Sequence, residues 1–189
     1  MHNDTFSRAA LTRRGLAGLA AGLAASTMLA PSAGLAQATS SANLAMVGEP
    51  QSLDPMASTA DLVGTIMQHV YEPLFTFDAN WAIQPMLAAA QPTVSADGKT
   101  YAIELRKGVK LHNGRELDAE DVVASLKRWL EMTPRGKGLA KSVASLTAKG
   151  PSSVEIVLGK VEPALLAHLA LPSGFAAIMA KESIANPLV

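Results

Sequence analysis

The stretch DAEDVVASLKRWL, residues 118–130, is the part of the chain that most clearly fixes a local structure. Asp118 is a good helix N-cap, and the acidic residues after it complement the positive end of a helix dipole. The apolar residues that follow recur at helical spacing and would share one face: Val122, Val123, Leu126, Trp129 and Leu130. The spacing therefore predicts an amphipathic helix with one buried face.

Strands are predicted on both sides of this helix. Tyr101, Ile103 and Leu105 alternate with other side chains, which is typical of a half-buried strand. The Asp97-Gly98 turn ahead of them indicates a β-hairpin, and Asn113-Gly114 indicates another turn. The remaining extended segments are expected at residues 43–47, 74–77, 109–111 and 154–158.

Two further helices complete the pattern. Ser58 or Thr59 can cap a helix that ends before Pro73, and another helix is expected over residues 164–171. Between residues 133 and 150 the pattern weakens, and prolines and glycines with nearby lysines predict an exposed loop. Helices and strands alternate without a repeat, so the expected fold class is α/β in the broad sense, with mixed α and β elements.

Residues 1–38 have the pattern of an export signal. Arg13-Arg14 precedes an uncharged run from Leu16 to Ala30, and the small residues Ala36 and Ala38 fit a signal peptidase that cuts after Ala38. The run is shorter than the roughly 18 to 20 residues that span hydrocarbon, so a removed leader is expected rather than a membrane anchor. The paired arginines also resemble a twin-arginine signal, and a general secretory signal is the alternative.

Charge and cysteine content exclude several classes of function. The 189 residues carry 16 basic and 16 acidic side chains, and removal of residues 1–38 takes away three basic and one acidic, which leaves a net charge of −2. No basic surplus is left to bind nucleic acid or an anionic membrane, so neither is expected as a partner. The absence of cysteine excludes disulfides, thiolate catalysis and cysteine-bound zinc.

Side chains suited to catalysis or metal binding are few. His69 and Glu72 would lie on one helical face as potential metal ligands, but no third ligand is near in sequence, which favours an ordinary helix end. His112 fits a hairpin tip, and His168 fits an apolar helix. Neither a phosphate-binding loop nor a nucleophile elbow is present. We therefore expect no catalytic residue, no metal and no cofactor.

Seven short motifs follow one another at close spacing along the chain: Glu49-Pro-x-Ser-Leu-Asp-Pro55, Val70-Tyr-Glu-Pro-Leu-Phe75 with Asp78, Ile83-x-Pro85 with Leu87-Ala88, Asp97-Gly-x-x-Tyr101, Leu105-Arg-x-Gly-Val-Lys110, His112-Asn-Gly114 and Ala119-x-Asp-Val-Val-x-Ser125. In order and spacing they resemble the amino-terminal part of the family 5 extracellular solute-binding proteins. These are the periplasmic dipeptide and oligopeptide receptors of ABC transporters. The resemblance runs from about Ala45 to Lys181.

This resemblance implies a type II periplasmic binding protein-like fold, of which the chain would contain only a part. Family members are far longer and have two lobes. Residues 39–58 would be a linker with the first strand and loop of domain I, and residues 59–171 would be the smaller domain II. Residues 172–189 would return toward domain I, and the second lobe would be missing.

The resemblance also implies a function, which is the capture of peptides in the periplasm of a Gram-negative type cell and their delivery to the permease subunits of an ABC importer. Ser58, Thr59, Ala60 and Asp61 would contact the peptide backbone, although the same four residues are equally explained as a helix N-cap without a ligand. Asp54 is expected to fix the turn before Pro55. Nickel complexes, glutathione-like compounds and sugars are alternative ligands within the same family.

Two other classes of function are kept open. One is an exported metal-dependent hydrolase that uses His69, Glu72 and His112. The other is an exported domain that assembles with a separate chain carrying the missing lobe, which the DNA after Val189 would reveal. The 189 residues alone are expected to bind ligand weakly, because a cleft with one wall cannot bury most of a ligand.

Overall fold

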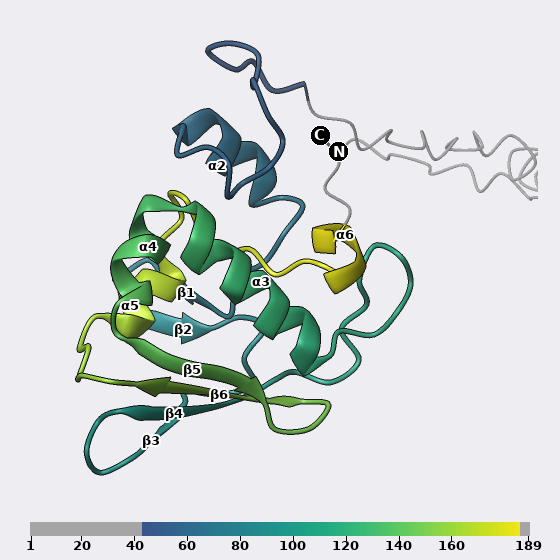
Figure 1. Cartoon of the computed structure of the whole chain (residues 1–189). Coiled ribbons are helices and arrows are strands. Elements are labelled where there is room, and N and C mark those ends of the chain that lie inside the picture. Colours follow the sequence, from purple (N-terminus) through teal and green to yellow (C-terminus); the bar gives the residue numbers. More distant parts are fainter. Residues whose placement is uncertain (1–42, 186–189) are drawn as a thin grey trace, which may run out of the picture. The chain divides into compact units, whose positions relative to one another are not determined.

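Residues 43–185 are described by the structure, a computed structural model of the chain (Figure 1). The predicted export signal at 1–38 and the linker residues 39–42 lie outside this range, as do residues 186–189. No helix among the described residues has both the length and the apolar character needed to cross a lipid bilayer. The elements in chain order are α2 (Asp61–Met67), β1 (Phe75–Phe77), β2 (Ile83–Pro85), β3 (Thr93–Val94), β4 (Thr100–Glu104), α3 (Ala119–Met132), α4 (Pro134–Ala140), β5 (Val143–Ala148), β6 (Ser153–Leu158), α5 (Leu165–Ala170) and α6 (Lys181–Ala185).

An antiparallel sheet with the strand order β3-β4-β6-β5 forms one layer of the unit that begins at Ala45. In the two central strands Tyr101 lies opposite Ile156, and Ile103 lies opposite Val154. All four side chains are buried, because alternate residues of a strand face the same side of its sheet. Helices α3, α4 and α5 lie on one side of this sheet (Figure 1). The predicted mixture of helices and strands is confirmed.

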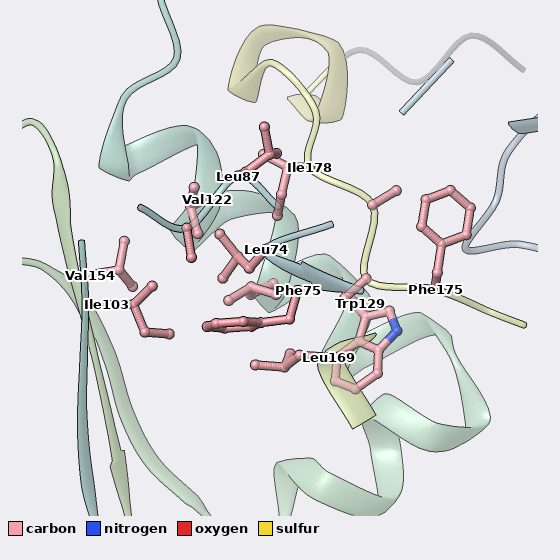
Figure 2. Close-up of a cluster of buried hydrophobic side chains, with 14 of the residues drawn as sticks. Leu74, Phe75, Leu87, Ile103, Val122, Trp129, Val154, Leu169, Phe175 and Ile178 are labelled. Carbon is pink, nitrogen blue, oxygen red and sulfur yellow. The ribbon is translucent and has the colours of Figure 1, made fainter. Parts of the chain in front are cut away.

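The hydrophobic core lies between the sheet and these helices. Figure 2 shows Ile103 and Val154 on the sheet side and Val122 and Trp129 of α3 on the helix side, with Phe75 of β1 between them. Phe75, Val154 and Trp129 are completely buried. Burial of apolar surface stabilises the fold by about 25 cal/mol per Å² removed from water, so these large side chains carry much of the stability.

Helix α3 confirms the strongest prediction from the sequence. The Asp118 carboxylate accepts a hydrogen bond from the Asp121 amide at 2.9 Å, and the Asp121 carboxylate accepts one from the Asp118 amide at 2.9 Å. This reciprocal capping box satisfies backbone donors that a helix otherwise leaves unpaired. The β3–β4 hairpin is also confirmed, and Gly98 turns it at a φ of 70°.

The exposed loop predicted at residues 133–150 is wrong, because this stretch forms α4 and β5. The Thr133 hydroxyl accepts a hydrogen bond from the Gly136 amide at 2.9 Å, and Pro134 occupies the first helical turn, where a missing N–H costs nothing. Strand β5 lies at the sheet edge and has an irregular register between Val143 and Ser145. Both features remove the alternation from which a strand is predicted.

Two predictions before α2 are also wrong. Residues 43–47 form no strand, and Val47 is 99% exposed, because no strand of the described residues pairs with them. The N-cap of α2 is Ala60, without a side-chain bond, rather than Ser58 or Thr59. Ser58 lies two residues too early, and its hydroxyl accepts a bond from the Ala60 amide at 3.2 Å instead.

Gly136 is required where α4 crosses the end of α3. A methyl group added to it would lie 2.0 Å from the carbonyl oxygen of Trp129, far inside van der Waals contact. Gly138 lies in the same helix, and a methyl group added there would meet no atom within 4 Å. Gly138 is therefore a matched control for a substitution at Gly136.

We predict that Gly136→Ala lowers the free energy of unfolding by about 1–3 kcal/mol, because the backbone of one helix must move to admit the methyl group. Gly138→Ala should leave it unchanged or raise it by up to about 1 kcal/mol, since alanine favours a helix more than glycine does. Urea unfolding followed by circular dichroism measures both. Equal effects of the two substitutions would contradict the close contact.

Candidate functional site

The four residues predicted to contact a ligand, Ser58, Thr59, Ala60 and Asp61, lie together on the surface where the chain enters α2. Ser58 is half-buried and the other three are exposed. Ala60 has extended backbone, with φ −63° and ψ 131°. Within the part of the chain that the structure describes, the amide groups of Ser58 and Thr59 donate no hydrogen bond. Ser58 and Thr59 therefore present main-chain donors that have no partner among the described residues.

Asp54 holds the turn that leads into this segment, but that turn contains Pro55 rather than preceding it as expected. Its carboxylate accepts a hydrogen bond from the Met56 amide at 2.9 Å, and its carbonyl accepts one from the Ala57 amide at 3.2 Å. Arg128 of α3 donates to both carboxylate oxygens. Burial alone would raise the pKa of Asp54, but the bonds from Arg128 and Met56 hold that pKa below its ordinary value. The turn is thus tied to the longest helix of the described residues.

The segment after α5 passes beside the same place. A Cβ added to Gly174 would lie 3.5 Å from the Thr59 methyl carbon, and one added to Gly64 would lie 3.5 Å from the Pro172 carbonyl oxygen. Residues more than a hundred positions apart in sequence therefore meet at the start of α2. We call residues 173–181 the return segment.

Side chains of α3 hold the backbone of the return segment. The indole Nε1 of Trp129 donates to the Gly174 carbonyl at 2.9 Å. The Ser125 hydroxyl accepts from the Met179 amide at 2.9 Å and donates to the Met179 carbonyl at 3.2 Å. One helical turn further toward the N-terminus, the Asp121 carboxylate accepts from the amide of Lys181 at 3.0 Å. These bonds allow an irregular backbone to be buried.

Asp121 is also the centre of a charge cluster. Its side chain is fully buried and lies 2.6 Å from the Arg115 guanidinium, which also pairs with Asp118 and, at 2.9 Å, with Glu182 of α6. Burial alone would raise the pKa of Asp121, but the hydrogen bonds from Arg115 and from the amides of Asp118 and Lys181 keep that pKa below its ordinary value. The carboxylate is therefore ionised at neutral pH.

Sequence reasoning did not find these bonds, although α3 carries a signal for them. Asp121 and Ser125 fall on the same face of the helix as Val122 and Trp129, and both are completely buried. A polar side chain on a buried helical face needs a hydrogen-bond partner, because burial without one is costly. The pattern could have predicted a bound backbone segment, but not which segment.

The expected placement of His69 and Glu72 on one helical face is wrong, because α2 ends at Met67. Both residues and His112 do line one cavity of about 590 Å³. The Nε2 atom of His112 faces the Val70 carbonyl at 2.9 Å and must donate its proton there, so it cannot bind a metal at the same time. The described residues contain no group of three or more side chains arranged to hold a metal ion.

Residues 82–187 match the sequence profile of the bacterial extracellular solute-binding proteins, family 5 (middle region). The chain belongs to this family. The probable peptide ABC transporter periplasmic-binding protein y4tO of Sinorhizobium fredii is 35% identical over 170 residues, which are 87% of this chain and 31% of the relative. The glutathione-binding protein GsiB of Escherichia coli is 32% identical over 64% of this chain and 24% of the relative.

Solved structures of binding proteins give the same result for the fold. Helicobacter pylori DppA in complex with the peptide STSA matches with a TM-score of 0.61 and 25% identity, over 70% of this chain and 29% of that one. Bacillus subtilis AppA in complex with a nonapeptide matches with a TM-score of 0.66 and 26% identity, over 75% of this chain and 28% of that one. The chain thus has part of a periplasmic binding protein fold, and it spans less than a third of these proteins. The hydrolase alternative finds no support in these comparisons.

We predict that Asp121→Asn lowers the free energy of unfolding by about 1–3 kcal/mol at pH 7, because the donors around it lose a charged acceptor while Arg115 keeps Asp118 and Glu182 as partners. The pKa of Asp121 is lower in the folded protein than the ordinary 3.8. Its stabilising effect is therefore complete well above pH 3.8 and is lost as the pH falls through the lowered value. The difference between wild type and variant should shrink at acid pH.

Urea unfolding at a series of pH values measures this difference. Glu131→Gln is the control, since it removes an exposed carboxylate from the same helix. A cost for Asp121→Asn that stays constant down to pH 2 would contradict the assignment of an ionised, paired carboxylate.

Proposed function

We propose that the protein is the solute receptor of an ABC importer, that it captures peptides in the periplasm, and that it delivers them to permease subunits in the inner membrane without catalysis. Membership of family 5 carries this proposal. The choice of peptides rests on the name of the Sinorhizobium relative and on the peptides bound to DppA and AppA. Glutathione is the competing solute, because a second relative is named for it.

We assign the ligand contact of this part of the protein to Ser58, Thr59, Ala60 and Asp61. An extended segment with unpaired amide groups can bind the backbone of an extended peptide, as an added strand binds to a sheet edge. Main-chain bonds read no side chains, so such a site tolerates many peptide sequences. In the proposed layout residues 59–171 form domain II, and domain I begins before and resumes after it. Closure of a second lobe over the peptide would complete the site.

Calorimetric titration with a mixture of di- to pentapeptides tests the proposal. Where the reading frame continues past Val189, the longer product is titrated beside the 189-residue chain. We expect the longer product to bind peptides and the chain alone to bind them weakly, because one wall of a cleft buries little of a ligand. Binding of glutathione alone by the longer product would overturn the choice of peptides, and tight peptide binding by the chain alone would overturn the two-walled site.

Substitutions at Thr59, made in the longer product, test the assigned segment. Thr59→Pro removes the amide donor, whereas Thr59→Ala removes only the side chain. If the main chain binds the peptide, Thr59→Pro should weaken peptide binding about tenfold and Thr59→Ala should change it little, since one hydrogen bond contributes about 1 kcal/mol. An unchanged midpoint of urea unfolding shows that the variant is folded. Equal affinities of the two variants would contradict the assignment.

Export can be tested at the amino terminus. Cleavage after Ala38 predicts that the protein recovered from the periplasmic fraction begins at Thr39, which N-terminal sequencing checks.

Replacement of Arg13 and Arg14 by lysines separates the two export routes. The twin-arginine route should then fail, whereas general secretion needs only positive charge. A mature product that retains residues 1–38 would contradict the predicted leader.

A further inference from the structure

The tip of the β1–β2 hairpin holds an exposed aromatic side chain on an unfavourable backbone. Trp81 has a φ of 61°, the one positive value for a residue other than glycine in the described chain. Its side chain is 72% exposed. Asp78 fixes the turn, because its carboxylate accepts bonds from the amides of Asn80 at 2.8 Å and Ala82 at 2.9 Å. Glycine would adopt this conformation without strain. Because the Trp81 side chain is exposed, its burial in the core does not explain why tryptophan stands here. Backbone strain of this kind often marks a functional position.

An aromatic cavity of about 280 Å³ lies beside this tryptophan. The rings of Phe77 and Trp81 lie 5.6 Å apart, and Tyr71 and Phe175 add two more aromatic walls. Of the described residues that line the cavity, Asp78 alone is charged, and it is negative. The cavity thus combines four aromatic residues with one carboxylate.

The negative charge of Asp78 has no counter-charge within the described residues. None of the ion pairs found among them includes Asp78. The amides of Ala82 and Asn80 and the Gln84 side chain hold its pKa below the ordinary value, which keeps the carboxylate ionised. A cation that enters the cavity therefore meets both a carboxylate without a counter-charge among the described residues and electron-rich aromatic rings.

We propose that this cavity binds the guanidinium group of an arginine side chain, stacked on Trp81 and paired with Asp78. A guanidinium ion is planar and weakly hydrated, so it stacks on an indole and pairs with a carboxylate better than a compact ammonium ion does. This site goes beyond the capture of a transported solute, and it does not depend on which solute that is.

Two small analogues test the proposal on the full chain. N-acetyl-arginine methylamide carries the guanidinium group, and N-acetyl-citrulline methylamide has the same shape without the charge. We expect saturable binding of the arginine analogue, at least tenfold tighter than that of the citrulline analogue. NMR should show a shift of the Trp81 indole signal and none for Trp129, which is buried. Equal affinities, or no saturable binding of the arginine analogue, would overturn the proposal.

Trp81→Gly separates binding from folding. Glycine relieves the backbone strain, so the midpoint of urea unfolding should not fall, whereas affinity for the arginine analogue should drop at least tenfold. Val94→Ala is the control, because it shortens another exposed apolar side chain, on β3, that does not line the cavity. Undiminished binding by Trp81→Gly would overturn the proposal, and the comparison of the two analogues stands without any variant.

Discussion

Hydrogen bonds from one face of α3 to the backbone of the return segment are the constraint on which the rest of the unit depends. That segment passes through the interior without belonging to a strand, so its amides and carbonyls have no ladder to join. Trp129, Ser125 and Asp121 supply partners on successive turns of one helix. With these polar groups paired, the segment can place Phe175 and Ile178 in the core. The chemistry of one helical face thus decides where a distant part of the chain lies.

The same helix fixes the approach to the proposed ligand segment. Arg128 lies next to Trp129 in α3 and binds Asp54, which turns the chain toward Ser58. Thr59 in turn lies against Gly174, whose carbonyl accepts a hydrogen bond from Trp129. The segment is thus held by the turn at Asp54 and by the contact with Gly174. A surface segment held in this way loses little conformational freedom when it binds a ligand, which favours affinity. The irregular backbone before α2 is therefore compatible with a prepared binding surface.

The sequence predicted the elements whose signal is local and missed those whose cause is distant. Helix α3 carries its own cap and a buried face, and β4 and β6 alternate cleanly, so all three could be found. Strand β5 pairs with one neighbour only, at the edge of the sheet, and residues 43–47 have no paired strand among the described residues. The spacing of apolar residues therefore predicted a loop for the first and a strand for the second, and both predictions were wrong. The proposed ligand segment came from family resemblance. The hydrogen bonds that support this segment join residues 45 to 74 positions apart. The spacing of apolar residues along the chain is a local signal and does not predict such contacts.

The β1–β2 hairpin shows how a rigid base sustains strain at an exposed tip. At the base, Phe75 is completely buried, and the Met86 amide donates a hydrogen bond to the Leu74 carbonyl at 2.9 Å. At the tip, the Asp78 carboxylate binds two amides of the turn, which leaves Trp81 no freedom to relax. Strain persists only where the surrounding structure determines the backbone more strongly than the residue's own preference. Because the anchoring side chain is also the carboxylate at the aromatic cavity, the group that fixes the turn is the group that gives the cavity its charge.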